Sequence, residues 1–407
     1  MSIYYKAFNQ ILYFGAMSYP ILILKKGREQ AIQRLHPWIF SGAFHRTKQN
    51  LEEGQPVWVG TQSGEIIATG HYSDSSIMVR VLAFEKTSID LDFYTKHIEQ
   101  AANLRKNILG LPNKKTNAYR LIAGEGDHLP GLIIDMYHTH AIVQTHTLGM
   151  YNSREMISEA LQHVFQNELE TVFLKSIHIK ENAYENEFLF GDTEEVLIKE
   201  HDVTFKVNWK EGQKTGFFLD QRDNRKLLQE FSSGKNVLNT FCYTGGFSAF
   251  ALEGGAKKVV SVDISESAMK MTDVNVSYTK KESRHESITA NVLQYLKEIE
   301  DNTFDIIVLD PPAFAKNRKK THNAVIAYKR INRIAMRKIK SGGLIFTFSC
   351  SQVIHKELFD NAVRSAAMEA GRKVKIIKHL NQSPDHVINA YHQEGHYLKG
   401  LIIHVSD

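Results

Sequence analysis

The chain has little cysteine and little proline, and it contains no long apolar run. Two cysteines among 407 residues exclude a scaffold built on disulfides and suit a reducing compartment, so we expect a cytoplasmic protein. No apolar run approaches the ~20 residues of a membrane-spanning helix, so we expect no membrane partner. His392 and His396 lie four apart, but the H-E-x-x-H pattern is missing and we expect no metal.

Neither sign of charge dominates the composition. The chain has 50 Lys and Arg against 45 Asp and Glu, a formal net charge of +5. This mild excess permits a nucleic-acid partner without requiring one, because the placement of the charges matters more. With 407 residues the chain is too long for one ordinary core, and two or three domains are expected.

The first 16 residues carry no core-forming pattern. Residues 1–16 hold one lysine, scattered aromatics and a short apolar stretch at 11–14. A secretory signal needs a longer apolar core and a clearly charged start. We therefore expect a poorly ordered extension, or a misassigned start ahead of Met17.

Residues 17–90 are expected to form a small β-domain. Short β-type segments separated by glycine turns occupy 21–24, 57–59, 65–70 and 77–82. This spacing predicts a small barrel or sandwich. Lys25 and Arg28 are predicted RNA contacts in this domain, with a solvated surface as the alternative.

Residues 91–205 are predicted to be an α+β middle domain. Helices are expected over 88–107 and 153–165, and strands over 119–124 and 131–145. No residue pattern in this part indicates chemistry, so we interpret it as a scaffold or an RNA platform.

Residues 206–407 show the alternation of an α/β domain. Strands are expected at 237–241, 258–262, 304–309 and 344–348, and a closing antiparallel strand at 397–405. Helical stretches separate them, which predicts a parallel sheet covered on both faces. Ligands of such sheets bind outside the carboxyl ends of the strands.

A glycine turn follows the first of these strands. Gly245 and Gly246 do not form the G-x-G-x-x-G fingerprint, yet such a turn lets a ligand approach backbone amides closely. Asp263 ends the next strand, where a carboxylate can accept both hydroxyls of a ribose. The pair fits S-adenosylmethionine or a nucleotide, with a plain structural turn as the alternative. Asn291, expected at the end of a further strand, could read an adenine edge.

A proline-rich loop follows the third strand, with the sequence Asp310-Pro311-Pro312-Ala313-Phe314. Its prolines fix the backbone and remove amide donors, so the carboxylate and the carbonyls are expected to face one small pocket. Phe314 can stack on a planar ring there. A rigid loop without a ligand is the alternative.

Cys350 lies at the end of the fourth strand, before a helix expected to begin near Gln352. A helix amino terminus lowers the pKa of a thiol and favours the thiolate. Most lone cysteines are inert core residues, and that interpretation stays open here. Cys242, beside the glycine turn, is interpreted as a packing residue.

Basic residues cluster directly after the proline-rich loop. They are Lys316, Arg318, Lys319 and Lys320. Arginines recur at helical spacing just beyond them. A solvated face is the usual interpretation of such a pattern. Adjacency to the predicted pocket makes contacts with phosphate groups an equal alternative.

Five motifs together resemble one family of enzymes. They are 217–222 (FFLDQR), 239–247 (NTFCYTGGF), 310–314 (DPPAF), 348–351 (FSCS) and 397–400 (YLKG). This combination closely resembles the class I S-adenosylmethionine-dependent methyltransferases of the large-subunit rRNA cytosine-C5 family. In addition, 24–28 and 36–42 resemble that family's PUA domain, an RNA-binding barrel, and 120–132 its middle domain.

The resemblance implies a fold, a reaction and a set of site residues. The fold is α/β, with an N-terminal PUA β-barrel, an α+β middle domain and a C-terminal Rossmann-like class I methyltransferase domain. The reaction is methylation of a 23S rRNA cytosine at C5, giving 5-methylcytosine, with S-adenosylmethionine as cofactor and Cys350 and Asp310 as catalytic residues. The implied cofactor-binding residues are Asp220, Gln221, Arg222, Asn239, Tyr243, Thr244, Gly245, Gly246, Asp263, Asn291 and Asp310. The implied contacts to the target base are Pro311, Pro312 and Phe314.

Two positions depart from the pattern of the family. Ala290 and Asn291 stand where members often carry an acidic residue, which weakens the adenine contact. Pro384 precedes Asp385 and His386, whereas the family usually has its proline after that pair.

The resemblance also implies a mechanism, and two alternatives stay open beside it. A thiolate that adds to C6 of cytosine makes C5 nucleophilic enough to take a methyl group. An amine methyltransferase acting on adenine N6 is one alternative, because an Asp-Pro-Pro-aromatic loop also suits that chemistry, although Ala313 intervenes here. A non-catalytic RNA-binding assembly factor is the other. The sequence does not identify the target nucleotide or the base that removes the C5 proton. A homodimer is a further open alternative.

Overall fold

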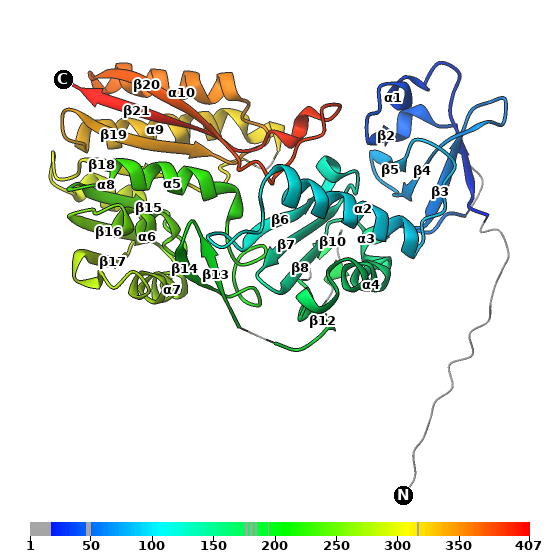
Figure 1. The fold of residues 1–407 in the computed structure, drawn as a ribbon. Helices are drawn as coiled ribbons and strands as arrows, with labels where there is room; N and C mark the ends of the chain where they lie inside the picture. The colour runs from blue at the N-terminus through cyan, green and yellow to red at the C-terminus, as the bar shows by residue number, and fades with distance from the viewer. Residues whose placement is uncertain are drawn as a thin grey trace, which may run out of the picture. The chain divides into compact units, whose positions relative to one another are not determined.

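The structure is a computed structural model, and it describes residues 18–45, 50–175, 178–179, 182–183, 185–193, 195–315 and 317–407. The extension expected over 1–16 lies outside these described residues, as does Met17. Contacts between residues divide the chain into two compact units, Met1–Asp90 and Leu91–Asp407 (Figure 1). In the described part of the chain, no helix is long and apolar enough to cross a membrane.

The first unit is built on a five-stranded sheet with the order β1-β3-β4-β5-β2. Its elements are β1 (Ile21–Ile23), α1 (Gln30–Gln33), β2 (Trp38–Phe40), β3 (Pro56–Gly60), β4 (Ile66–Tyr72) and β5 (Ile77–Ala83). Leu22, Val57 and Val79 are buried in its core. β4 and β5 approach closely at Gly70, where a Cβ atom would lie 2.2 Å from the carbonyl oxygen of Arg80. The short strands expected in this part are confirmed.

The N-terminal part of the second unit contains a five-stranded sheet of order β12-β9-β8-β7-β6. Its strands are β6 (Ala118–Ala123), β7 (Leu132–Tyr137), β8 (His140–Thr145), β9 (Thr171–Leu174) and β12 (Glu187–Phe190). The single strand expected over 131–145 is wrong. His138 adopts a φ of 58°, and the chain turns there from β7 into its antiparallel partner β8.

Helices and two short ribbons accompany this middle sheet. They are α2 (Leu91–Asn103), α3 (Leu148–Asn152), α4 (Arg154–Phe165), the ribbon of β10 (His178–Ile179) and β11 (Asn182–Ala183), and the ribbon of β13 (Val196–Glu200) and β14 (Val203–Val207). The helix expected over 153–165 is confirmed as α4, which buries Ile157, Ala160 and Leu161. The mixture of sheet and helices is the α+β arrangement that the sequence predicts.

The C-terminal part carries a seven-stranded sheet with the order β17-β16-β15-β18-β19-β21-β20. Its strands are β15 (Asn236–Thr240), β16 (Lys258–Asp263), β17 (His285–Thr289), β18 (Ile306–Leu309), β19 (Gly343–Ser349), β20 (Lys373–Asn381) and β21 (Lys399–Ser406). The first five are parallel, and β21 runs antiparallel to both β19 and β20. The parallel sheet and its closing antiparallel strand are thereby confirmed.

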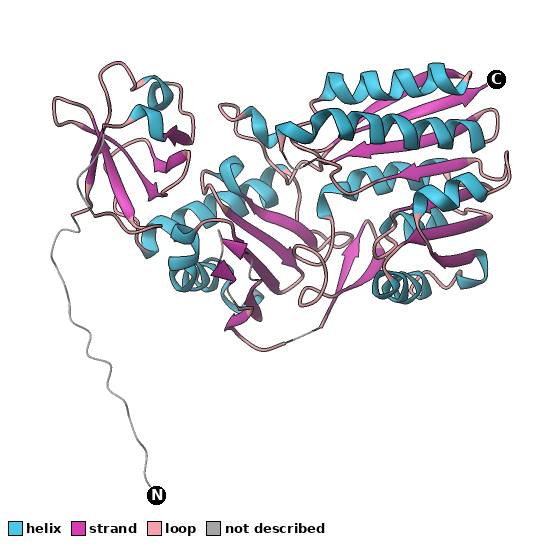
Figure 2. Ribbon diagram, turned by 180° about the vertical axis from the view of Figure 1, so that it is seen from behind, coloured by secondary structure: helices cyan, strands magenta, loops and turns pink. Residues whose placement is uncertain are grey.

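Helices cover both faces of this sheet because both faces of its strands are apolar. Ile307 and Leu309 of β18 pack in one core cluster, and the alternating Ile306 and Val308 pack in another. The helices are α5 (Arg222–Phe231), α6 (Gly246–Glu253) and α7 (Glu266–Ser277) on one face, and α8 (Val292–Glu298), α9 (Thr321–Lys338) and α10 (Lys356–Ala370) on the other (Figures 1 and 2).

Buried ion pairs tie the loop before β21 to the middle sheet. The carboxylate of Asp385 accepts two hydrogen bonds from the Arg222 guanidinium, each of 3.0 Å, and one of 2.8 Å from the backbone amide of Arg120. Its backbone carbonyl accepts from Arg105 at 2.7 Å. The Arg120 side chain in turn pairs with Asp135 at 2.6 and 2.9 Å. One buried aspartate therefore contacts three arginines that are distant in the sequence, through its carboxylate and its backbone carbonyl.

Candidate active site

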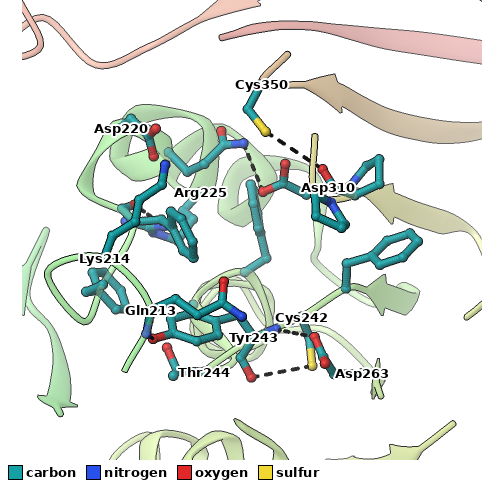
Figure 3. Close-up of a pocket in the computed structure, with 18 of the residues that line it drawn as sticks. Gln213, Lys214, Asp220, Arg225, Cys242, Tyr243, Thr244, Asp263, Asp310 and Cys350 are labelled. Carbon is teal, nitrogen blue, oxygen red and sulfur yellow. Dashed lines mark hydrogen bonds between the residues drawn. The ribbon is translucent and has the colours of Figure 1, made fainter. Parts of the chain in front are cut away.

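A cavity opens at the carboxyl ends of β15, β16, β18 and β19, and its free space, counted with its mouth, measures about 1020 Å³. Figure 3 shows Cys350 and Asp310 at one end of it and Tyr243, Thr244 and Asp263 at the other. The residues that line it are Gln213, Lys214, Phe217, Phe218, Asp220, Gln221, Arg225, Phe241, Cys242, Tyr243, Thr244, Gly246, Phe247, Asp263, Ile264, Asp310, Pro311, Pro312, Cys350 and Leu398.

The glycine turn after β15 shapes one wall of the cavity. Gly245 precedes α6 with a φ of +78°, and a Cβ atom there would lie 2.7 Å from Cγ2 of Thr272. A side chain at this position would meet both strain and a clash, so the turn requires glycine. The Gly245 amide donates to the Cys242 carbonyl at 2.9 Å, and Thr244 and Gly246 line the cavity beside the turn. A close approach of a ligand to backbone amides here stays a prediction.

Asp263 is fixed beside this turn. Its Oδ2 accepts from the backbone amide of Tyr243 at 3.0 Å, and its Oδ1 accepts from that of Ser265 at 2.9 Å. Each carboxylate oxygen has a second lone pair, so both can still accept a hydrogen bond from a ligand. The carboxylate is thus oriented in advance at the edge of the cavity.

Asp220 has an unsatisfied oxygen beside the cavity. Its Oδ2 accepts from the Tyr397 hydroxyl at 2.7 Å, whereas its Oδ1 is buried and has no hydrogen-bond donor within the described residues. Burial opposes its ionisation, but His386, Lys214 and the Tyr397 hydroxyl together hold its pKa below the usual value. A buried carboxylate oxygen without a donor indicates a ligand group that supplies one.

Asp310 lies at the end of β18 and retains its proton more readily than an ordinary carboxyl group. Burial and the nearby charge of Asp220 raise its pKa to about 7. Gln221 donates to it from Nε2 at 3.0 Å, and the Gln221 Oε1 accepts from Asn224 at 2.6 Å, which holds the amide in place. The group can therefore act as a proton donor near neutral pH.

Cys350 lies beside Asp310 because β18 and β19 are parallel neighbours. Its Sγ donates to the carbonyl oxygen of Pro311 at 4.0 Å. The expected helix start near Gln352 is wrong, because the chain first turns and α10 begins only at Lys356. The predicted lowering of the thiol pKa is wrong as well, since burial and the Asp310 charge raise the pKa of Cys350 to about 11.

Two residues implied as cofactor contacts have structural partners instead. The Arg222 side chain is buried against Asp385 and does not line the cavity. The Nδ2 of Asn239 donates to the Ser248 hydroxyl at 2.8 Å, and its buried Oδ1 has no donor within the described residues. Neither Arg222 nor Asn239 is among the residues that line the cavity.

Two further predicted contacts lie away from the lining. Asn291 caps α8, where its Oδ1 accepts from the Gln294 amide at 3.2 Å, and its side chain is exposed. It does not end a strand, because β17 stops at Thr289. Phe314 turns into the core, with its ring centroid 4.7 Å from that of Tyr328. Among the residues expected to hold the target base, Pro311 and Pro312 line the cavity and Phe314 does not.

The lining also contains residues that sequence reasoning missed. Lys214 lies in the loop before α5, with its ammonium 5.2 Å from the ring centroid of Phe218. Lys175 is buried beneath that loop and donates to the carbonyl oxygens of Trp209 and Gly212, which holds the loop against the cavity. A lysine between glycines just ahead of the 217–222 motif was the available signal.

The predicted RNA contacts lie on exposed surfaces. Arg318, Lys319 and Lys320 form one exposed 3₁₀ turn before α9. Lys316 lies outside the described residues. In the first unit Lys25 and Arg28 are exposed, and Lys25 donates to the Gly42 carbonyl at 3.0 Å. Their contact with RNA stays a prediction. Among the described residues, no group of three His, Cys, Asp or Glu side chains is arranged to hold a metal ion.

Comparison with known proteins identifies the family. The family model for S-adenosylmethionine-dependent methyltransferases matches residues 171–389. The chain belongs to this family. A second model, for PUA-like domains, matches residues 22–84 of the methyltransferase. The matches confirm the expected class I fold, the N-terminal PUA-like domain, the enzyme class and S-adenosylmethionine as the cofactor.

Relatives of the methyltransferase match almost its whole length. Ribosomal RNA large subunit methyltransferase I of Tolumonas auensis is 39% identical over 93% of this chain and 98% of its own. The enzyme of the same name from Aeromonas hydrophila is 38% identical over 94% of this chain and 98% of its own. The crystal structure of SMU.776 in complex with SAH has a TM-score of 0.82 and 25% identity, covering 95% of this chain and 100% of that one.

Proposed function

We propose that this methyltransferase transfers a methyl group to C5 of a specific cytosine in 23S rRNA through a covalent bond between Cys350 and C6 of the base. The observation that carries the proposal is the meeting of a thiol and a proton-bearing carboxyl group at one end of the cavity, with the Cys350 Sγ against the Pro311 carbonyl. The relatives named as ribosomal RNA large subunit methyltransferases support the choice of RNA.

The cavity fits S-adenosylmethionine, which supplies a methyl group on a positively charged sulfur. We expect Asp263 to accept the hydroxyls of its ribose, because both carboxylate oxygens keep a free lone pair. The unsatisfied Oδ1 of Asp220 suits an N–H donor such as the amino group of the methionine part. We expect the glycine turn, where Thr244 and Gly246 line the cavity, to let the cofactor approach the backbone closely.

Cys350 begins the chemistry as a thiolate. Its sulfur adds to C6, a C–S bond forms, and the electron pair of the C5–C6 double bond becomes available at C5. C5 then takes the methyl group, while the bond from that group to the sulfonium breaks and its electron pair stays on sulfur. A base removes the C5 proton, the C5–C6 double bond re-forms, and the Cys350 thiolate leaves.

Asp310 assists the addition from the side of the pyrimidine ring. With its pKa raised to about 7 it still carries a proton near neutrality, and it can donate that proton toward N3 of the cytosine. This withdraws electron density from the ring, which makes C6 more electrophilic. Pro311 and Pro312 have no backbone N–H, so they offer the pocket only carbonyl oxygens, which suit the N4 amino group.

RNA has to bring the target base out of any stacked helix to reach this cavity. We propose that Arg318, Lys319 and Lys320 hold phosphates beside its mouth, and that Lys25 and Arg28 do so on the PUA-like domain. Lysine and arginine contacts of this kind position an RNA without reading its sequence. Selection of one cytosine then rests on the shape of the RNA around it.

The proposed reaction is tested by locating the methyl group. The purified enzyme is incubated with 23S rRNA and S-adenosylmethionine labelled in the methyl group, and the digested nucleosides are analysed by mass spectrometry. The label is expected in 5-methylcytidine. Label in N6-methyladenosine would favour the amine methyltransferase instead. Cofactor and RNA binding without any labelled nucleoside would favour an RNA-binding assembly factor.

Asp263→Ala is expected to weaken binding of S-adenosylmethionine by ~1.5–3 kcal/mol, the scale for losing hydrogen bonds to a charged acceptor. Isothermal titration calorimetry measures this directly. Glu266→Ala is the matched control, because that carboxylate lies three residues further on and is exposed. Unchanged affinity in Asp263→Ala would remove this residue from the cofactor site.

A further inference from the structure

Lys399 is a buried cation beside Cys350. It begins β21, where it pairs in register with Ser349, the residue before Cys350. Its Nζ donates to the carbonyl oxygen of Ser351 at 2.6 Å and to that of Tyr397 at 2.8 Å. Within the described residues no carboxylate forms an ion pair with it. The backbone of Lys399 thus pairs with the residue before the cysteine, and its side chain contacts the residue after it.

The buried ammonium group of Lys399 is energetically costly, so its presence requires an explanation. Burial lowers the pKa of Lys399 to about 8, and a charge on Cys350 opposes that shift. Carbonyl oxygens offer dipoles to an ammonium group but no counter-charge, so its burial stays costly. An apolar side chain would fill the same space without that cost, as the buried Leu398 does next to it.

The residues described so far around Cys350 provide little positive charge to stabilise its thiolate. Burial raises the pKa of the thiol, the charges of Asp220 and of Asp310 in its deprotonated form raise it further, and Lys214 lowers it across the cavity. Tyr328 faces Cys350 from α9, and its own pKa is raised mainly by burial and also by a charge on that cysteine. The amino terminus of α10 lies too far along the chain to help. A cation within the protein is therefore needed to stabilise the Cys350 thiolate.

We propose that Lys399 is the positioning residue for the nucleophile, fixing the turn at Cys350 through the Ser351 carbonyl and stabilising the Cys350 thiolate with its charge. This inference rests on the proposed role of Cys350. The same turn is held from the other side by the Ser351 hydroxyl, which donates to the Ala315 carbonyl at 2.6 Å. When RNA closes the cavity and excludes water, the attraction between ammonium and thiolate becomes stronger.

The test measures the reactivity of the thiol in the full-length enzyme. Iodoacetamide labelling of Cys350 is followed by peptide mass spectrometry across pH in wild type, Lys399→Met, Lys399→Gln and Lys399→Arg. Lys399→Met is expected to slow labelling about tenfold at neutral pH, where Lys399 still carries its charge, because the fraction of thiolate falls by that factor. Lys399→Gln keeps a donor for the carbonyl but no charge, so it should slow labelling similarly. Lys399→Arg should restore most of the wild-type profile.

The methylation rate supplies the second measurement, and at neutral pH it should fall by a similar factor in both neutral variants. SAH titration and thermal unfolding show that each variant is folded, and Lys340→Met is the control, since that lysine pairs with Asp305 away from the cavity. An unchanged labelling profile in a folded neutral variant would overturn the proposal. Turnover by Cys350→Ala would instead overturn the proposed function, whatever the labelling profile of Lys399 variants.

Discussion

Cys350→Ala is expected to abolish methyl transfer, by on the order of 10⁴-fold or more, the scale of losing an enzymatic nucleophile. Binding of cofactor and RNA should stay within about twofold of wild type, because among the described residues the thiol donates one weak hydrogen bond, to Pro311. Single-turnover methylation of 23S rRNA measures the loss of chemistry, and calorimetry with SAH measures the retained binding. Such a separation of rate from affinity is the mark of a group that acts in the reaction itself.

A covalent trap gives the same prediction a second measurement. RNA with 5-fluorocytosine at the target position should form a stable adduct with wild type, because fluorine blocks removal of a proton from C5. Cys350→Ala should form none. Wild-type rates in Cys350→Ala would rule out the C5 mechanism and promote methylation of an amine.

Cys242→Ala is the matched control for this experiment. Cys242 also lines the cavity, but its Sγ lies 3.4 Å from the sulfur of Met269 and 3.9 Å from the Thr272 hydroxyl. Burial and the charge of Asp263 raise its pKa above the ordinary value, so it is a poor nucleophile. Cys242→Ala should therefore retain substantial activity, which distinguishes a specific loss at Cys350 from a general effect of removing a thiol.

The sequence predicts the meeting of Asp310 and Cys350 because both follow directly on strands. In a parallel sheet the carboxyl ends of neighbouring strands share one edge, and β18 and β19 are such neighbours. Asp263 is predictable on the same ground, since it ends β16. Residues placed by the end of a strand can be found from the periodicity of apolar residues alone.

Residues placed by loops and by long-range pairing are harder to predict. The start of α10 is wrong in the sequence interpretation because His355, an unusual capping residue, accepts from the Leu358 amide and ends the turn that Ile354 anchors in the core. The prediction that Phe314 lies in the pocket is wrong because its ring packs against Tyr328, which lies 14 residues further along the chain. No local sequence pattern indicates a helix cap formed by a residue of low capping propensity. Nor does one indicate whether an aromatic ring packs in the pocket or in the core.

Asp385 is the clearest case of a residue that the sequence could not place. Its partners Arg105, Arg120 and Arg222 lie 280, 265 and 163 residues away along the chain. Sequence reasoning assigned Arg222 to the cofactor because it stands within a motif. Its guanidinium instead donates hydrogen bonds to the Asp385 carboxylate. Within this motif Arg222 therefore stabilises the fold, whereas other residues line the cavity. Only the structure shows this difference.

Asp385→Asn is expected to lower the free energy of unfolding by about 3–5 kcal/mol, because removing one partner leaves the buried Arg222 without its main counter-charge. Urea denaturation of the full-length enzyme measures the change. Asp202→Asn is the matched control. Asp202 pairs with Lys115 at 3.6 Å, but both side chains are more than half exposed, so the same substitution should cost less than about 0.5 kcal/mol.

The destabilisation in Asp385→Asn should also depend on pH, in a direction that the pKa of Asp385 fixes. Burial opposes its ionisation, but His386, Arg222 and the backbone amide of Arg120 outweigh this and hold the pKa far below the usual value. A carboxyl whose folded pKa is depressed contributes stability above its unfolded pKa of ~3.9 and loses it as pH falls toward the folded value. The gap between wild type and Asp385→Asn should therefore be constant from neutral pH to about pH 5 and should shrink between about pH 4 and pH 2.

Other carboxyl groups do not obscure this difference. The pKa of Asp220 is also lowered, but Asp220 is present in both proteins and cancels in the comparison. Asp310 titrates near pH 7, well above the window in question. A gap that stayed constant down to about pH 2 would mean that Asp385 does not carry its charge in the folded protein. The protonated carboxyl group would then act through hydrogen bonds alone, and a loss nearer the ~1 kcal/mol of a neutral bond would be expected at every pH.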